Sequence, residues 1–360
     1  MSPVPTALAM IKNVAPEDED CLTLNVYTPS LKSDGMAPLP VMFYIHGGGF
    51  SNFSGSIMLF EPGNLVSRGG VVVVTINYRL GLFGWFENAN TWSRSTVPGN
   101  QGLRDQILAL QWVQNNITAF GGDPNRATLF GESSGGHSIR VLLSAPSAFG
   151  LYHSVISESC DLGDLTCARR KSTNDILEAS MIAEQKVLED DPWTTFRLVL
   201  RLAADGDLIP DDFSARVNTE KYNTKANVLW GATKDEAGFY LSLFFPNPIP
   251  IANTNISDAL GYLSRQMATH KPTYNYRFSR GRDTPLVGDD ARFSRQVIDR
   301  LTTFAKTRDP NPQSGLVGVE SKNEDVTNVK WEPYGAENPV LDLNLKSRML
   351  ENLEADLLSI

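Results

Sequence analysis

The chain has 360 residues, of which 41% are hydrophobic, so it can bury a large core. Its 32 Lys and Arg residues against 41 Asp and Glu residues give a formal net charge of −9. An acidic chain without a basic block is a poor candidate for binding nucleic acid or an anionic membrane. We expect no membrane span, because no apolar run is long enough, and no signal peptide, because residues 1–11 lack a basic start and a long apolar core. The sequence leaves open the cellular compartment of the protein.

The three cysteines, Cys21, Cys160 and Cys167, do not have the spacing of a metal site. Cys160 and Cys167 are close enough in sequence to close a small loop, which would leave Cys21 single. The sequence therefore predicts no bound metal.

The first third of the chain predicts several strands. Residues 21–27 alternate between apolar and polar side chains, and residues 41–45 and 71–76 are continuous apolar runs. Unbroken apolar runs are typical of strands that are covered on both faces of a sheet. The run at 41–45 leads directly into His46 and three consecutive glycines.

A helix followed by a strand is predicted next. Apolar residues recur at helical spacing between Leu103 and Phe120, and residues 121–124 contain the glycines and proline that end a helix. Residues 127–130 then form a short apolar strand, which meets the Gly-x-Ser-x-Gly pattern at 131–135.

The rest of the chain continues this alternation of strands and helices. Strands are predicted at 151–157, 226–230 and 274–278, and helices at 171–191, 293–306 and 343–358. Such alternation implies a mostly parallel sheet with helices on both faces, which is an α/β fold. No repeat or linker divides the sequence, so we expect residues 1–360 to form a single domain.

Residues 131–135 predict a nucleophile elbow. In this turn a serine, here Ser133, sits between a strand and a helix, with small neighbours that let the backbone bend tightly. The helix amino terminus that follows also favours developing negative charge. A Gly/Ser turn that matches by chance is the alternative, but the predicted strand before it and helix after it favour the elbow.

An activated serine also needs donors for the oxyanion. A glycine-rich loop after a buried strand can turn its backbone N–H groups outward, and the N–H that follows the nucleophile completes such a hole. This nominates Gly48, Gly49 and the backbone N–H of Ser134. The alternative is that the glycines form only a flexible turn.

Several motifs together resemble the type-B carboxylesterase (cholinesterase-like) family. They lie at residues 19–29, 46–50, 77–81, 99–106, 120–124, 130–136, 234–236, 304–311 and 331–334. The resemblance implies an α/β-hydrolase fold, hydrolysis of a small-molecule ester through an acyl-enzyme, and no cofactor. It also implies that Glu236 is the catalytic acid and that Glu132 and Ser159 are supporting polar groups.

The catalytic histidine is where the sequence departs from this pattern. Triads of this fold follow the chain order serine, acid, histidine, and only His270 follows Glu236. In the family the histidine comes after the strand that matches 274–278, whereas here that strand is followed by no histidine. We expect His270 to lie at the other end of the strand. Because losing the histidine of a serine hydrolase costs about a millionfold in turnover, the sequence predicts strongly impaired esterase activity.

The other three histidines have different expected roles. His46 should order the glycine loop, His153 should be structural, and His137 should point along the helix that follows Ser133. None of them has the position in the chain order that the family's catalytic histidine occupies.

Two further hypotheses about the function of the chain stay open. The chain could be a non-catalytic, cholinesterase-like binding module, or a truncated and inactive product that folds poorly. Relatives are longer at the amino terminus, where they usually carry a signal peptide and a cysteine that would pair with Cys21. The resemblance also suggests that Cys160 and Cys167 mimic the family's second disulfide loop. The tryptophan that binds choline in cholinesterases has no counterpart, because no tryptophan precedes Trp85.

Overall fold

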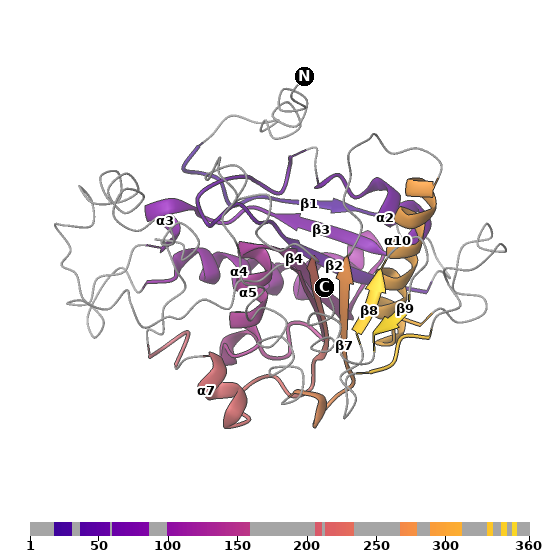
Figure 1. The fold of residues 1–360 in the computed structure, drawn as a ribbon. Coiled ribbons are helices and arrows are strands. Elements are labelled where there is room, and N and C mark those ends of the chain that lie inside the picture. The colour runs from indigo at the N-terminus through magenta and orange to yellow at the C-terminus, as the bar shows by residue number, and fades with distance from the viewer. Residues whose placement is uncertain are drawn as a thin grey trace, which may run out of the picture.

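The computed structural model describes eleven stretches of the chain. They are residues 18–30, 37–57, 60–85, 99–158, 206–210, 213–233, 267–278, 289–311, 330–333, 340–343 and 348–350. Within them, nine strands form one sheet in the order β1-β3-β2-β4-β5-β6-β7-β8-β9 (Figure 1). The strands are β1 (Leu24–Tyr27), β2 (Leu39–Ile45), β3 (Val72–Ile76), β4 (Gly122–Glu132), β5 (Ser154–Glu158), β6 (Asn227–Thr233), β7 (Thr273–Phe278), β8 (Val340–Leu343) and β9 (Arg348–Leu350).

The sheet is mostly parallel, as the sequence predicts. All strands from β3 to β8 in the spatial order run parallel to their neighbours, and only the outer strands β1 and β9 pair antiparallel. The carboxyl ends of the parallel strands therefore meet at one edge of the sheet. In an open α/β sheet this edge is where ligands bind.

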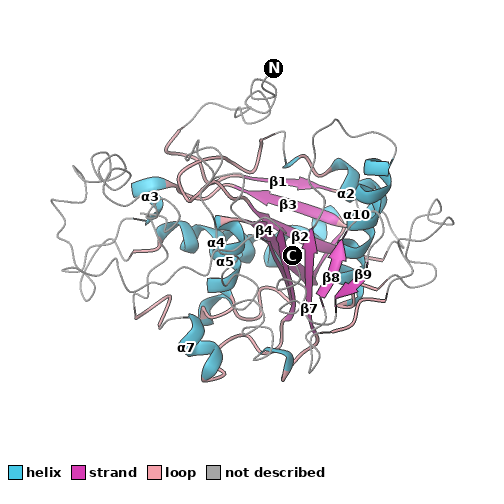
Figure 2. Ribbon diagram, viewed as in Figure 1, coloured by secondary structure: helices cyan, strands magenta, loops and turns pink. Residues whose placement is uncertain are grey.

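Helices cover both faces of the sheet (Figure 2). On one face, α4 (Gln101–Asn116), α5 (Ser134–Leu142) and α7 (Phe213–Asn218) contribute side chains to the larger hydrophobic cluster. On the other face, α2 (Gly63–Gly69) and α10 (Asp289–Thr307) contribute to the smaller one. Consecutive residues of β2 alternate between the clusters, so Met42 belongs to the smaller and Phe43 to the larger. This arrangement explains why the strand reads as an unbroken apolar run.

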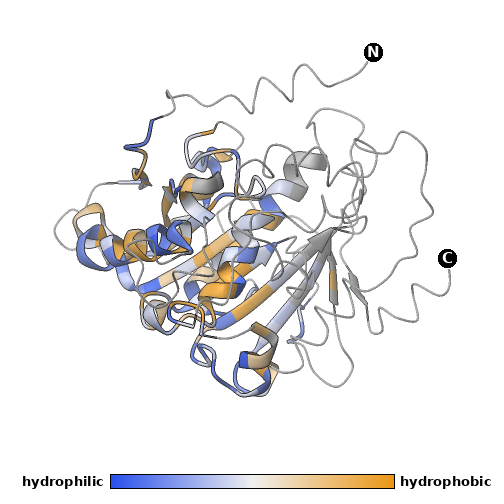
Figure 3. Cartoon of the chain, turned by 90° about the vertical axis from the view of Figure 1, so that its left-hand side faces the viewer, coloured by the Kyte–Doolittle hydropathy of each residue, from blue (hydrophilic) through white to orange (hydrophobic). Residues whose placement is uncertain are grey.

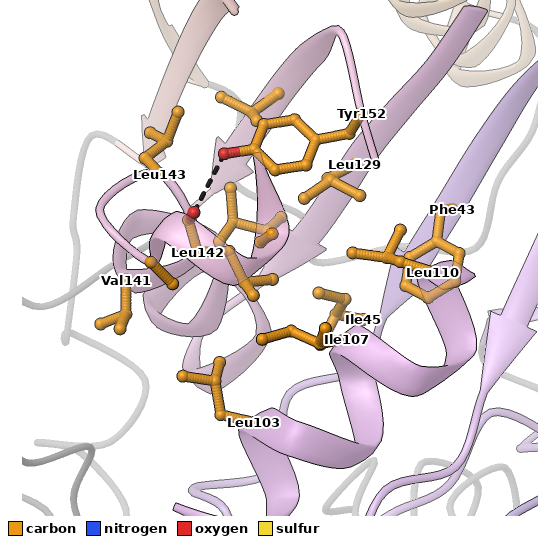
Figure 4. Packing of buried hydrophobic residues seen from close by; sticks show 14 of the residues in the cluster. Phe43, Ile45, Leu103, Ile107, Leu110, Leu129, Val141, Leu142, Leu143 and Tyr152 are labelled. Carbon is orange, nitrogen blue, oxygen red and sulfur yellow. Dashed lines mark hydrogen bonds between the residues drawn. The ribbon is translucent and has the colours of Figure 1, made fainter. Parts of the chain in front are cut away.

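The larger cluster holds the elements around Ser133 in place. Figure 4 shows Leu110 of α4 beside Phe43 of β2, and Ile107 of α4 beside Ile45 of β2. The Tyr152 hydroxyl donates a hydrogen bond to the Leu142 carbonyl oxygen at 3.0 Å, at the end of α5 (Figure 4). Figure 3 colours the residues by hydropathy and shows hydrophobic stretches along the strands inside the molecule. The turn at Ser133 thus lies between a buried strand and a buried helix.

The predicted elements differ from the observed ones in a few places. The short strand expected at 127–130 is longer, because β4 begins at Gly122 and runs through the expected helix stop. The helix at 103–120 gives way to a 3-10 turn, η2 (Ile117–Phe120). The helix expected at 343–358 is wrong where the structure describes it, since β8 and β9 pair there. The helix expected at 171–191 lies outside the described residues.

Candidate active site

Ser133 occupies the sharp turn between β4 and α5. Its backbone has φ 56° and ψ −124°, a region that non-glycine residues rarely adopt and that costs about 1–3 kcal/mol. Two backbone hydrogen bonds fix the turn: Ser133 N–H donates to the Glu158 carbonyl oxygen, and His137 N–H donates to the Ser133 carbonyl oxygen, both at 2.9 Å. The conformation is the one expected of a nucleophile elbow.

The glycines around Ser133 are required by close packing. A Cβ added to Gly135 would lie 2.0 Å from the Ile45 carbonyl oxygen, and one added to Gly131 would lie 2.6 Å from the same atom. A Cβ on Gly136 would lie 2.6 Å from the Glu158 carbonyl oxygen. Backbone cannot move aside as a flexible side chain can, so larger residues would push α5 away from the sheet.

The glycine loop that follows β2 lies directly beside this turn. A Cβ on Gly47 would come within 3.1 Å of Ser133 Cβ and 2.8 Å of the Glu132 carbonyl oxygen. Gly48 and Gly49 have φ values of 106° and 64°, which glycine adopts without strain. The fold therefore brings the loop that the sequence nominates for oxyanion binding to Ser133.

His46 anchors the start of this loop, in line with its expected role. Its Nδ1 is 2.8 Å from the Gly47 carbonyl oxygen, and its ring stacks on Tyr78 with centroids 4.4 Å apart. Burial lowers the pKa of His46 to about 4, although the hydrogen bond to Gly47 opposes the shift. His46 is therefore neutral near pH 7, and the nitrogen bound to a carbonyl must be the protonated Nδ1.

Phe50 closes the loop, and its role has no sign in the sequence pattern. Phe50 is fully buried and has φ 62°, which costs a non-glycine residue about 1–2 kcal/mol. Its ring packs edge to face on Trp85, with centroids 4.6 Å apart. The sequence pattern also gives no sign of the hydrogen bond from the Phe50 N–H to the Ser134 hydroxyl, or of Tyr78, whose hydroxyl binds the His46 carbonyl oxygen. The signal that could have found Tyr78 is its place just after β3, whose carboxyl end shares the edge that holds Ser133.

Two glutamates lie side by side next to Ser133. Glu132 and Glu158 are register partners at the ends of β4 and β5. Tyr276 on β7 donates a hydrogen bond to Glu158 Oε1. Burial raises the pKa of the nearby Tyr44 phenol, and the two carboxylates raise it further. The family resemblance of the sequence predicts Glu132 as a supporting polar group. The position of Glu158 beside it follows only from the strand register.

His270 lies at the opposite edge of the sheet from Ser133. His270 precedes β7, whose first residue is Thr273. The register of the strands from β4 to β7 places Thr273 at the same level of the sheet as Leu129 of β4. Leu129 is four residues before Ser133, so at least about 13 Å of strand separates the two levels. His270 instead stacks on Tyr222, with ring centroids 5.9 Å apart. The expected position of His270 at the other end of its strand is confirmed.

Two other histidines also have structural partners. His137 Nε2 accepts a hydrogen bond from Arg140 Nη2 at 3.2 Å, further along α5. His153 precedes β5, at the amino ends of the parallel strands. Its backbone N–H donates a hydrogen bond to the Ala127 carbonyl oxygen at 2.8 Å. Burial lowers the pKa of His153, and the charge of Arg308 lowers it further.

Some nominated residues lie outside the described residues, namely Glu236, Ser159, Cys160 and Cys167. Glu236 comes three residues after Thr233, where β6 ends at the same edge as Ser133. Cys21 is a free thiol. Within the described stretches, no group of three or more His, Cys, Asp or Glu residues could hold a metal ion. In the same part of the chain, no helix is both long and apolar enough to cross a membrane.

Comparison with known proteins agrees with the fold. The carboxylesterase family model matches residues 5–164. Para-nitrobenzyl esterase of Bacillus subtilis is 34% identical over 273 residues, which are 69% of this chain and 53% of that protein. Liver carboxylesterase 1 of Oryctolagus cuniculus is 47% identical over 161 residues, which are 44% of this chain and 27% of that protein. A solved PNB esterase superposes with a TM-score of 0.74 at 25% identity, covering 96% of this chain and 86% of that one.

The fold and the site define a protein of the α/β-hydrolase class. Within that class the chain is similar to the carboxylesterase family, whose model matches residues 5–164. It spans about half the length of the Bacillus relative and about a quarter of the Oryctolagus relative.

Proposed function

We propose that the chain is a carboxylic-ester hydrolase that acts on a small-molecule ester through an acyl-enzyme on Ser133. The observation that carries this proposal is the backbone of Ser133, held at φ 56° between β4 and α5. A strained conformation persists only when its surroundings enforce it, and such strain gathers at functional sites. The names of the relatives, which are esterases, point to the same chemistry.

The roles of the neighbouring residues follow from the reaction. Ser133 Oγ attacks the ester carbonyl carbon, and the carbonyl oxygen takes up negative charge. The backbone N–H groups of Gly48, Gly49 and Ser134 would hold that oxygen, and losing one such donor typically costs 10²–10³ in kcat. The C–O bond to the leaving group then breaks, and the proton lost by Ser133 goes to the departing alkoxide, which leaves as the alcohol. Water next attacks the acyl-serine, which releases the carboxylic acid and returns a proton to Ser133. Glu236 would be the acid that orients and stabilises a base. The reaction as proposed needs no cofactor.

Hydrolysis of a short-chain p-nitrophenyl ester tests this proposal. The rate of the wild-type chain above background should disappear in Ser133→Ala, because the variant has no nucleophile. Ser138→Ala is the matched control, since Ser138 lies on the same helix and its hydroxyl accepts a hydrogen bond from Gln106 Nε2 at 3.0 Å. Equal rates for the wild type and Ser133→Ala would contradict the proposal.

We also propose that turnover is slow because Ser133 lacks an efficient base. Three observations support this proposal. His270 and His153 lie at the other edge of the sheet, the buried His46 has a pKa of about 4, and His137 Nε2 already accepts a hydrogen bond from Arg140. A base whose pKa is far below the operating pH, or whose nitrogen is occupied, takes a proton poorly.

Added imidazole distinguishes a slow hydrolase from a binding module. If only the base is missing, the Ser133-dependent rate should rise with the concentration of neutral imidazole, after subtraction of the rate measured with Ser133→Ala. If imidazole has no effect and the wild-type rate is high, the chain has a base of its own and the proposed impairment is wrong. If no Ser133-dependent rate appears at any imidazole concentration, the chain is a non-catalytic relative of the carboxylesterases.

A further inference from the structure

The backbone of Phe50 is fixed on both sides. Its carbonyl oxygen accepts hydrogen bonds from the Gly81 N–H at 2.8 Å and from Trp85 Nε1 at 3.1 Å. Its N–H donates to the Ser134 hydroxyl oxygen at 3.3 Å. Of these contacts, only the last one links the glycine loop to the nucleophile helix. The left-handed backbone of Phe50 therefore depends on partners from two segments of the chain, α3 (Gly81–Trp85) and the start of α5.

The Tyr78 hydroxyl binds the start of the loop, as the Ser134 hydroxyl binds its end. Tyr78 is fully buried and donates its hydroxyl proton to the His46 carbonyl oxygen at 2.7 Å. Burial raises the pKa of the Tyr78 phenol. The two hydroxyls thus contact both ends of the loop, at His46 and Phe50.

We propose that Ser134 and Tyr78 are positioning residues, whose hydroxyls hold the loop from His46 to Phe50 at a fixed distance from the nucleophile turn. This inference rests on the proposed function, since the loop matters to the reaction only as part of the oxyanion hole. Ser134 would then act twice: its backbone N–H is one proposed donor, and its side chain holds the loop that carries the other two, Gly48 and Gly49.

A small shift of this loop should be costly. Hydrogen bonds weaken steeply as their geometry degrades, and donors act on the oxyanion only when they are already in place. A misplacement of about 1 Å can reduce the rate about 100-fold. Substrate binding in the ground state depends less on these donors, because the full charge forms only in the transition state.

Hydrogen exchange of the Phe50 amide tests the hydrogen bonds without any need for turnover. The amide should be protected in the wild type and should exchange at least about 10-fold faster in Ser134→Ala, because the variant removes its acceptor. Ser138→Ala removes a hydroxyl of the same kind from the same helix, but one bound to Gln106. It should leave Phe50 exchange unchanged.

The rate of Ser133 acetylation by p-nitrophenyl acetate, measured with imidazole present, tests the effect on the reaction. Ser134→Ala should lower the maximal rate about 10- to 100-fold and should change the half-saturating ester concentration less than about twofold. Tyr78→Phe should act in the same direction, and the double variant should lose less than the product of the two single losses. Ser138→Ala should keep the wild-type rate.

Two results would overturn the inference. One is unchanged Phe50 exchange in a folded Ser134→Ala, which would mean that the hydroxyl does not hold the loop. The other is faster exchange with an undiminished maximal rate, which would mean that the loop position does not matter to the reaction. A wild-type chain that is never acetylated at Ser133 would contradict the proposed function instead, while the exchange comparison would still report on the hydroxyl.

Discussion

At the scale of single residues, the turn at Ser133 is held by contacts that leave no space for larger neighbours. Its N–H binds the end of β5, and the glycines on either side let α5 approach β2 and β5 closely. The surrounding backbone therefore supports the strain stored at Ser133. The glycine loop beside it is built in the same way, with Phe50 in a left-handed conformation between fixed partners.

Replacing Gly135 with alanine should destabilise the protein strongly. The added Cβ would lie 2.0 Å from the Ile45 carbonyl oxygen, and neither backbone can move without disturbing the sheet. We expect a loss of about 3 kcal/mol or more in the free energy of unfolding. The comparison is Gly150→Ala, where nothing lies within 4 Å of the new Cβ and only the φ of 84° is unfavourable. That variant should lose about 1–2 kcal/mol. Equal losses in denaturant titrations would contradict the packing argument.

His46 should make stability depend on pH. Its folded pKa is about 4 and its ordinary value is 6.5, so between these values the unfolded chain binds a proton that the folded chain does not. The stability that a neutral His46 allows is fully present above pH 6.5 and is lost as the pH falls towards 4, by about 3 kcal/mol in all. Thermal unfolding from pH 7 to pH 4 should therefore show a smaller fall in Tm for His46→Gln than for the wild type. Parallel falls would exclude His46 as a source of the pH dependence.

At the scale of elements, one ion pair joins two helices that are far apart in the sequence. Arg68 of α2 binds Asp299 of α10 through two hydrogen bonds of 2.7 Å, which is the bidentate geometry that suits a guanidinium and a carboxylate. The side chain of Asp299 is only 5% exposed and that of Arg68 is 17% exposed. The pair therefore fixes the two helices that cover one face of the sheet.

Removing Arg68 should lower the free energy of unfolding more than removing one partner of an exposed ion pair. Arg68→Leu leaves the carboxylate of Asp299 buried without its cation, and we expect the free energy of unfolding to fall by about 2–3 kcal/mol. The matched comparison is Asp207→Asn, which breaks a pair with Arg104 in which Asp207 is 79% exposed. That change should cost less than about 1 kcal/mol. A denaturant titration that ranks the two variants the other way would refute this assignment.

The elements near the site could be predicted because local and tertiary preferences agree there. The run at 41–45 is apolar and buried on both faces, and the stripe of α4 matches the surface that it covers. At the carboxyl end of the chain, the local periodicity and the tertiary strand pairing disagree. The spacing at 343–358 suits a helix, but backbone pairing of β8 with β7 and of β9 with β8 determines the structure there. Sequence periodicity cannot report a partner strand that lies far away along the chain.

The site was predictable where a motif fixes the backbone, and not where contacts arise from the strand register. Ser133 and the glycine loop carry their own signature, since only small residues permit the turns. Glu158 and Tyr276 meet because β5 and β7 end at the same edge, and the Ser134 hydroxyl reaches Phe50 across 84 residues. Such contacts follow from strand order, which the sequence alone does not reveal.

At the scale of the whole molecule, strands drawn from residues 24 to 350 share one sheet. We propose that residues 1–360 form a single domain and therefore unfold as a unit. Calorimetry should give one transition, with a calorimetric enthalpy equal to the van't Hoff enthalpy. Two separate transitions would contradict a single domain. Aggregation without any cooperative transition would instead favour a truncated product that folds poorly.

We propose Ser133 as the nucleophile of an ester hydrolase, and the mass of the intact protein after exposure to p-nitrophenyl acetate tests this role most directly. With imidazole present and p-nitrophenolate as a good leaving group, acylation should be faster than deacylation, so an acyl-enzyme should accumulate. We expect a mass increase of one acetyl group, located on Ser133 by peptide mapping and missing from Ser133→Ala. A wild-type chain that stays unmodified, or one acetylated equally in both proteins, would contradict it.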